Sequence, residues 1–238
     1  MVSKSQIKLI ASLQKKKFRD KEGLFIAEGP KVISELIEAG LEIHAHFSTC
    51  IPENPSKSFF HITELELKKI SALKTANTAV AIFKIPEPNT TSSEGLVLAM
   101  DAIRDPGNLG TIIRLSDWFG VAKLVCSLDT VDCYNSKVVQ ATMGSIARVT
   151  IQYCNLSEYL LNASLPIYGG VLNGENIYTS EMPKKAIVVL GNEANGISDE
   201  IMTLISNKIT IPQFGVSQKT ESLNVATATA ILLSEFNR

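Results

Sequence analysis

Residues 96–120 read LVLAMDAIRDPGNLGTIIRLSDWFG, and this segment gives the strongest indication of the fold class. It begins with the apolar run LVLAM, which predicts a strand that is buried on both faces. After a polar turn, the pattern over 108–119 predicts a helix whose packing face includes Leu109, Ile112 and Ile113. A strand that leads through a turn into a helix is the unit from which parallel α/β sheets are built.

The same alternation continues towards the C-terminus. Further apolar runs that suit buried strands lie at 123–127, 149–153, 167–171, 186–190 and 209–212. Helical patterns lie at 135–147, 198–206 and 222–236. The pattern predicts an α/β fold in which helices cover both faces of a parallel sheet and ligands bind beyond the carboxyl ends of the strands.

Residues 86–95, PEPNTTSSEG, are typical of a linker because two prolines are followed by small polar residues and glycine. They predict two domains, at 1–88 and 95–238. The first is predicted to be a small α/β unit. Its expected helices cover 4–18, the residues after Pro30, and 64–72, and its expected strands cover 24–27, 43–48 and 79–85.

Composition excludes several classes of protein. The chain has 238 residues, of which 45% are hydrophobic and 20% charged, as in an ordinary globular protein. No apolar run approaches the roughly 20 residues that cross a bilayer, and the first residues lack the apolar core of a signal peptide. The four cysteines form no Cys-x-x-Cys pair, which argues against a zinc site or a disulfide framework. We therefore expect a soluble, cytoplasmic protein that holds no metal.

Positive charge is concentrated at the start of the chain. Residues 1–21 contain seven lysines and arginines and one acid, a net charge of +6, whereas the whole chain carries −1. Such a block can follow a nucleic-acid backbone, and Lys15, Lys16, Lys17 and Arg19 are the candidate contacts. The alternative is a solvated helix face, a common role of lysine runs.

The first candidate site motif is Asn108-x-Gly110-x-x-x-Arg114, at the start of the predicted helix. Helix N-termini attract anions through their unpaired N–H groups. Arg114 shares one side of the helix with Gly110, so its guanidinium could grip a phosphate over the space that glycine leaves. The alternative is that Asn108 is a simple helix cap and Arg114 a surface charge.

The second motif is LGNEANGI at 190–197, directly after the strand predicted at 186–190. Two glycines flank Glu193, which allows a tight loop that presents one carboxylate at the carboxyl end of a strand. It lacks the spacing of the dinucleotide and Walker phosphate loops. A plain turn between strand and helix is the alternative.

The third motif combines Ile211-Pro212 with SLNVA at 222–226, where an apolar helix begins. Ser222 is the expected N-cap of this helix, which is a structural role. Asn224 follows two residues later, at the start of this apolar helix. A buried side-chain amide needs hydrogen-bond partners, so a functional role is favoured for Asn224.

Taken together, the three motifs resemble those of the SpoU, or TrmH, family of the SPOUT superfamily of RNA methyltransferases. The resemblance covers essentially all of 95–238. Glu28-Gly29-Pro30 and the helix after it extend it more weakly to the family's accessory RNA-binding domain, which is L30e-like.

The resemblance implies a knotted parallel-sheet catalytic domain with a deep trefoil knot, which forms a homodimer and binds S-adenosyl-L-methionine. The reaction would transfer a methyl group to a ribose 2′-hydroxyl, with rRNA favoured over tRNA as substrate. The residues implied at the reaction site are Asn108, Arg114, Glu193, Ser222 and Asn224. Those implied around the cofactor are Leu172, Asn173, Gly174, Leu190, Gly191, Asn192, Ile211, Pro212, Ser222 and Leu223.

Two other functions fit the same residues. One is a knotted RNA-binding protein without catalysis, against which the intact set of reaction-site residues argues. The other is a methyltransferase that acts on a base, which usually needs a further proton acceptor near the ring; the sequence offers no obvious one.

Overall fold

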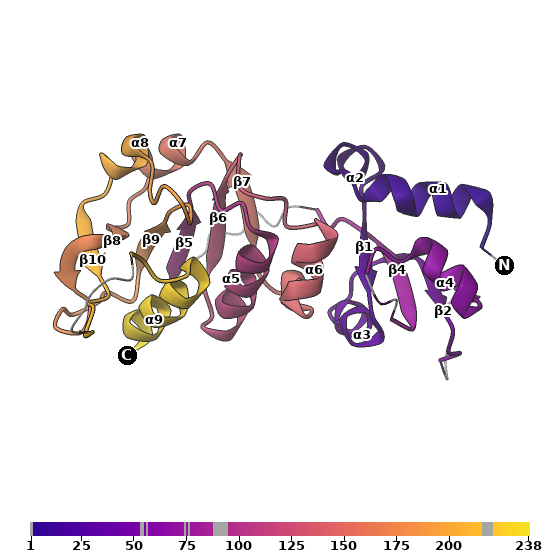
Figure 1. Ribbon diagram of the computed structural model, residues 1–238. Coiled ribbons are helices and arrows are strands. Elements are labelled where there is room, and N and C mark those ends of the chain that lie inside the picture. The colour runs from indigo at the N-terminus through magenta and orange to yellow at the C-terminus, as the bar shows by residue number, and fades with distance from the viewer. Residues whose placement is uncertain are drawn as a thin grey trace. The chain divides into compact units, whose positions relative to one another are not determined.

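The structure is a computed structural model that describes residues 2–52, 55, 57–73, 75, 77–87, 95–215 and 221–238 (Figure 1). Its chain divides into two compact units. The first comprises Met1–Glu87 with Asp132–Arg148, and the second comprises Pro88–Val131 with Val149–Arg238. The segment 132–148 thus groups with the N-terminal residues. The predicted linker at 86–95 lies largely outside the described residues.

The first unit is built on a four-stranded sheet of order β1-β4-β2-β3, in which only the β2–β3 pair is parallel. The strands predicted at 24–27, 43–48 and 79–85 are confirmed, with small shifts at two ends. The elements in chain order are α1 (Lys4–Leu13), α2 (Lys16–Glu22), β1 (Leu24–Glu28), α3 (Pro30–Glu38), β2 (Ile43–Ser48), β3 (Phe59–His61), α4 (Glu64–Ile70), β4 (Ala79–Lys84), α6 (Ser136–Thr142) and the 3-10 helix η1 (Ser145–Ala147).

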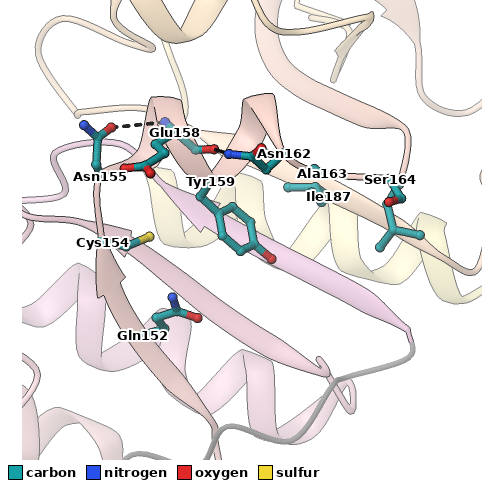
Figure 2. Close-up of a pocket in the computed structure, with 10 residues that line it drawn as sticks. Gln152, Cys154, Asn155, Glu158, Tyr159, Asn162, Ala163, Ser164 and Ile187 are labelled. Carbon is teal, nitrogen blue, oxygen red and sulfur yellow. Dashed lines mark hydrogen bonds between the residues drawn. The ribbon is translucent and has the colours of Figure 1, made fainter.

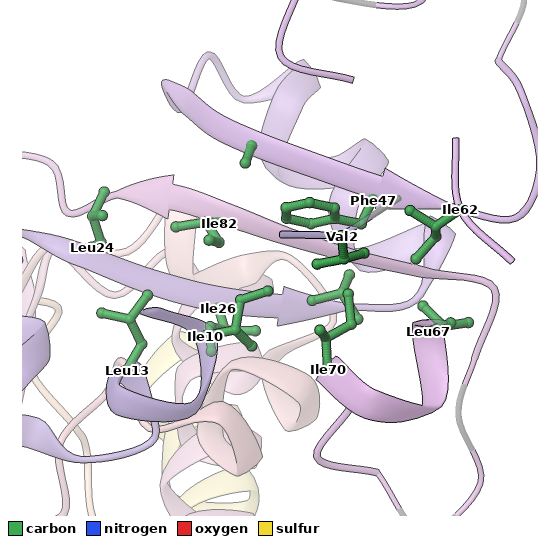
Figure 3. Packing of buried hydrophobic residues seen from close by; sticks show 12 residues of the cluster. Val2, Ile10, Leu13, Leu24, Ile26, Phe47, Ile62, Leu67, Ile70 and Ile82 are labelled. Atoms are coloured by element: carbon green, nitrogen blue, oxygen red, sulfur yellow. The ribbon is translucent and has the colours of Figure 1, made fainter. Parts of the chain in front are cut away.

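One face of this sheet packs against α1 and α4 (Figure 3). Ile10 and Leu13 of α1 meet Ile26 and Ile82 of the sheet in a single buried cluster. The opposite face presents Phe25, whose ring centroid lies 4.8 Å from that of Tyr134 in the segment 132–148. The sheet is therefore covered on both faces.

The basic helix predicted over 4–18 is instead two helices, because the backbone is extended at Lys15. Arg19 of α2 turns inward and is only 2% exposed. Its Nε donates to Asp132 Oδ2 (2.9 Å), and its Nη1 donates to the carbonyl of Leu13 (2.8 Å) at the end of α1. The expectation that Arg19 contacts RNA is therefore wrong, since this guanidinium is buried and fully engaged.

The second unit contains a six-stranded sheet of order β10-β8-β9-β5-β6-β7, and every pair in it is parallel. The predicted parallel α/β fold is confirmed. Its elements in chain order are β5 (Leu96–Met100), α5 (Pro106–Trp118), β6 (Lys123–Ser127), β7 (Ile151–Cys154), α7 (Leu156–Leu161), β8 (Ile167–Asn176), β9 (Ala186–Leu190), α8 (Asp199–Met202), β10 (Asn207–Thr210) and α9 (Val225–Asn237).

Helices cover both faces of this sheet. Successive side chains of a strand point to opposite faces, and both sets are apolar in the central strands β5 and β9, so each face needs a covering layer. On one side, Val97 and Val189 pack with Leu156 and Leu160 of α7. On the other side lies α9, whose Phe236 ring meets Tyr168 of β8 edge to face, with 5.3 Å between ring centroids. No helix among the described residues has the length and apolar character needed to span a membrane.

Candidate functional site

The loop between β5 and α5 positions Asn108. Asp105 is the N-cap of α5, and its Oδ1 accepts a hydrogen bond from the Asn108 backbone N–H (2.8 Å). Asn108 is therefore not a simple cap, and its side-chain amide is available for other partners. Pro106 suits the first turn, where a helix leaves N–H groups without intrahelical acceptors.

The Asn108 side chain joins three segments that lie far apart in the sequence. Its Nδ2 donates to Glu193 Oε1 (2.8 Å), and its Oδ1 accepts from Asn224 Nδ2 (2.9 Å). Glu193 lies in the loop after β9 and Asn224 at the start of α9. The structure thus brings together three of the five residues implied at the reaction site.

Asn224, and not Ser222, is the N-cap of the last helix. Its Oδ1 accepts from the backbone N–H groups of Ala226 (2.9 Å) and Thr227 (3.3 Å), so α9 begins later than the predicted 222. The expected cap role of Ser222 is wrong, and its exposed hydroxyl makes no hydrogen bond within the described part of the chain. Asn224 is exposed rather than buried, yet both halves of its amide have partners.

Arg114 lies on α5 and is exposed. Its guanidinium forms neither an ion pair nor a hydrogen bond with any residue that the structure describes, so the Asn108–Glu193–Asn224 group does not include it. A cation without a protein partner is available to an anionic ligand such as an RNA phosphate.

The loop 191–197 is closed tightly on itself. A Cβ at Gly191 would lie 2.1 Å from the carbonyl carbon of Gly196, which no side chain could tolerate. Asn192 exchanges two backbone hydrogen bonds with Gly196, and its Oδ1 accepts from Ala194 N (2.9 Å). Asn192 Nδ2 donates to the carbonyl of Ala102 (2.7 Å), so this side chain is engaged within the protein.

Of the other segments implied around the cofactor, Leu172–Gly174 lies within the C-terminal half of β8, and Ile211–Pro212 directly follows β10. The pairing of these strands shifts register between Lys208 and Ile209, and Thr210 Oγ1 donates to the carbonyl of Leu172 (3.0 Å). A Cβ at Gly174 would lie 2.7 Å from the Lys208 carbonyl oxygen. The strands thus approach so closely that residue 174 must be glycine.

Apolar side chains from these segments are left uncovered. Leu172 is 68% exposed and Leu223 48% exposed, whereas Leu190 at the end of β9 is buried. Asn173 is exposed, and Ile211 and Pro212 are half-buried.

A separate hollow of about 560 Å³ lies beside α7 and the edge strand β7 (Figure 2). Cys154, Glu158 and Tyr159 line it, and burial, followed by the nearby Glu158, raises the pKa of the Cys154 thiol. None of its lining residues was predicted for the site. A second hollow, of about 390 Å³, includes Gly174 and Lys208.

Sequence reasoning missed the turn beneath the site. Asp101 is 7% exposed, and its Oδ2 accepts from the backbone N–H of Ser198 (2.7 Å), while Ala102 bonds to Asn192. An aspartate and an alanine after a strand carry no signal that would have singled them out.

The chain belongs to the SpoU rRNA methylase family, whose model matches residues 95–234. The MRM3-like substrate-binding domain matches residues 4–81. The resemblance predicted from the motifs is confirmed.

Individual relatives match over nearly the whole chain. The 23S rRNA (guanosine(2553)-2′-O)-methyltransferase RlmP of Bacillus subtilis (strain 168) is 29% identical over 93% of this chain and 91% of its own. The structure of a TrmH-family protein from Porphyromonas gingivalis shares 36% identity and a TM-score of 0.89, covering 100% of this chain and 98% of that one. The AdoMet-bound rRNA methyltransferase from Sinorhizobium meliloti shares 27% identity and a TM-score of 0.85, covering 99% and 96%.

Proposed function

We propose that this protein is an S-adenosylmethionine-dependent RNA methyltransferase that modifies a ribose 2′-hydroxyl, with rRNA as the favoured substrate. The observation that carries the proposal is the hydrogen-bonded group Glu193–Asn108–Asn224, which three distant motifs of the family assemble. The relatives support the substrate class, since RlmP is named for 2′-O-methylation of 23S rRNA.

The proposal assigns residues 95–238 to the methyltransferase domain and 1–88 to an L30e-like accessory RNA-binding domain. The two family matches, at 95–234 and 4–81, support this division. The catalytic domain carries a trefoil knot and forms a homodimer in the cytoplasm. The all-parallel six-stranded sheet and the apolar helix α9 are compatible with that architecture.

The residues around the proposed cofactor site fit an adenosyl group. Exposed leucines at 172 and 223 offer apolar contacts to an adenine ring, as small-molecule sites usually do. The backbone of the segments that contain Gly174, Gly191 and Ile211 would surround the rest of the group. When bound, S-adenosylmethionine supplies an electrophilic methyl group.

The reaction-site residues have distinct roles in this proposal. Asn108, Glu193 and Asn224 form one hydrogen-bonded unit, which fixes the geometry in which the ribose hydroxyl is held. Arg114 grips the adjacent phosphate and stabilises the negative charge that forms on the hydroxyl oxygen. A guanidinium keeps its proton in a protein, so Arg114 does not act as a base. Ser222 helps to orient the substrate.

A transfer assay tests the proposal. The protein is incubated with rRNA and S-adenosylmethionine labelled in its methyl group, and the RNA is digested to nucleosides for mass analysis. We expect the label on ribose. Label on a base would instead identify a base methyltransferase. Absence of transfer, together with no heat of cofactor binding in calorimetry, would identify an RNA-binding protein without catalysis.

A further inference from the structure

The turn after β5 contains a residue in an unusual backbone conformation. Ala102 has a φ of 57°, and among the described non-glycine residues only Met143 also has a positive φ. This left-handed region is disfavoured for an L-residue because Cβ comes too close to the following carbonyl oxygen. Such a conformation persists only where its surroundings hold it.

Two side chains from other segments hold the polar backbone groups of Ala102. Its N–H donates to Ser127 Oγ (2.9 Å), and its carbonyl accepts from Asn192 Nδ2 (2.7 Å). Ser127 is buried at the end of β6, and its hydroxyl in turn donates to Asp129 Oδ1 (2.7 Å). The strands β6 and β9 flank β5, so the turn is held from both sides.

Asn192 uses the other half of its amide within its own loop. Its Oδ1 accepts from the backbone N–H groups of Ala194 (2.9 Å) and Asn195 (3.2 Å). One side chain therefore shapes the loop after β9 and ties it to the turn after β5. The bond between Ser198 N and buried Asp101 is a second tie between the same two segments.

We infer that Asn192 is a positioning residue for the methyl-transfer site: by holding Ala102 in its left-handed conformation, it sets the spacing between Asn108 and Glu193. This inference rests on the proposed function. Glu193 follows Asn192 directly, and Asn108 lies a short way downstream of Ala102. The 2.8 Å bond between Asn108 and Glu193 therefore joins the same two segments that Asn192 ties together.

The variant Asn192→Asp tests this role. The aspartate keeps an oxygen that can accept from the backbone N–H groups of Ala194 and Asn195. Its second oxygen replaces the Asn192 Nδ2 donor, so the Ala102 carbonyl loses its hydrogen bond and faces a negative charge. We expect kcat to fall roughly tenfold to a hundredfold, because small misplacements of reacting groups are costly, while KM for RNA and for S-adenosylmethionine stays within about twofold. Asn195→Asp is the matched control, since it adds the same charge to the same loop at an exposed position, and we expect normal turnover.

Adding Ala102→Gly provides a rescue experiment. Glycine adopts the left-handed conformation without steric cost, so the turn depends less on Asn192. The double variant should therefore recover a clear part of the lost kcat. Normal kcat in Asn192→Asp, or a double variant no better than the single one, would overturn the inference.

Hydrogen exchange separates this inference from the proposed function. Peptides that cover 101–109 should exchange faster in Asn192→Asp than in the wild type or in Asn195→Asp, and unchanged exchange would overturn the inference even if the protein transfers no methyl group. If Asn192→Asp does not fold, Ser127→Ala tests the same turn from its other side, with the same expected loss of kcat and the same rescue. Wild-type protein that fails to methylate ribose would contradict the proposed function alone.

Discussion

The side-chain amide of Asn108 donates to Glu193 and accepts from Asn224, so its two ends cannot be exchanged without breaking both contacts. Such a chain of polar groups holds each member in one orientation. Arg114 contributes differently, because it is exposed and has no partner among the described residues. The proposed site therefore has two parts: the hydrogen-bonded group of Asn108, Glu193 and Asn224, and the exposed guanidinium of Arg114.

Replacing Arg114 tests the second part. Arg114→Lys keeps the charge but loses the planar fork that binds a phosphate through two hydrogen bonds. We expect turnover to fall by about a hundredfold, as when one group that stabilises the transition state is removed, while calorimetry shows unchanged cofactor affinity. Arg238→Lys, at an exposed position of the C-terminus, is the control. Near-normal turnover of Arg114→Lys would show that the bidentate grip is not required.

The sequence motifs predicted Asn108, Glu193 and Asn224 as site residues from residue type and order, and the structure joins these three by hydrogen bonds. The sequence could not assign the N-cap of α9, since serine and asparagine are both favourable at this position. Only the structure shows that the first free N–H groups of the helix donate to Asn224 and not to Ser222. The burial of Arg19 could not be predicted either, because its acceptor Asp132 is distant in sequence.

At the scale of elements, the strands buried on both faces were the easiest to predict. Leu96–Met100 and Ala186–Leu190 are uninterrupted apolar runs, and Lys123–Ser127 has an apolar centre; the predicted bounds of all three are those of the structure. Short elements were missed or misjudged. The three-residue β3, the six-residue α7 and the four-residue α8 depend on tertiary contacts, which local sequence does not reveal.

The corner between α1 and α2 provides a prediction about stability. Arg19→Met leaves Asp132, whose side chain is only 13% exposed, without its cation, and leaves the Leu13 carbonyl without its donor. We expect a loss of about 3 kcal/mol in the free energy of unfolding, measured by urea denaturation. The control Lys16→Met removes an exposed ion pair with Asp20 and should change stability by less than about 0.5 kcal/mol. Equal effects of the two variants would contradict the importance of the buried pair.

At the level of the whole molecule, we propose that residues 1–88 bind RNA and that residues 95–238 catalyse methyl transfer. Of the basic residues predicted to contact RNA, Lys15, Lys16 and Lys17 are exposed. Their charge would add affinity by displacing the counterions of the RNA backbone, and this contribution weakens as salt rises.

Replacing these three lysines by glutamine should weaken RNA binding and flatten its salt dependence. If each contacts one phosphate, the slope of log Kd against log salt should fall by about two. The control replaces the exposed Lys68, Lys69 and Lys184 in the same way. An unchanged slope in the first variant, or an equal change in the control, would exclude these lysines as specific phosphate contacts.

We propose that this chain methylates a ribose 2′-hydroxyl of rRNA. The most direct measurement compares the modified nucleosides of rRNA and tRNA from cells with and without the protein. We expect one 2′-O-methylated nucleoside to disappear from rRNA while base methylation does not change. The intact protein should restore the lost nucleoside, whereas Arg114→Lys should not. Undiminished ribose methylation in cells without the protein, or a loss confined to methylated bases, would contradict the proposal.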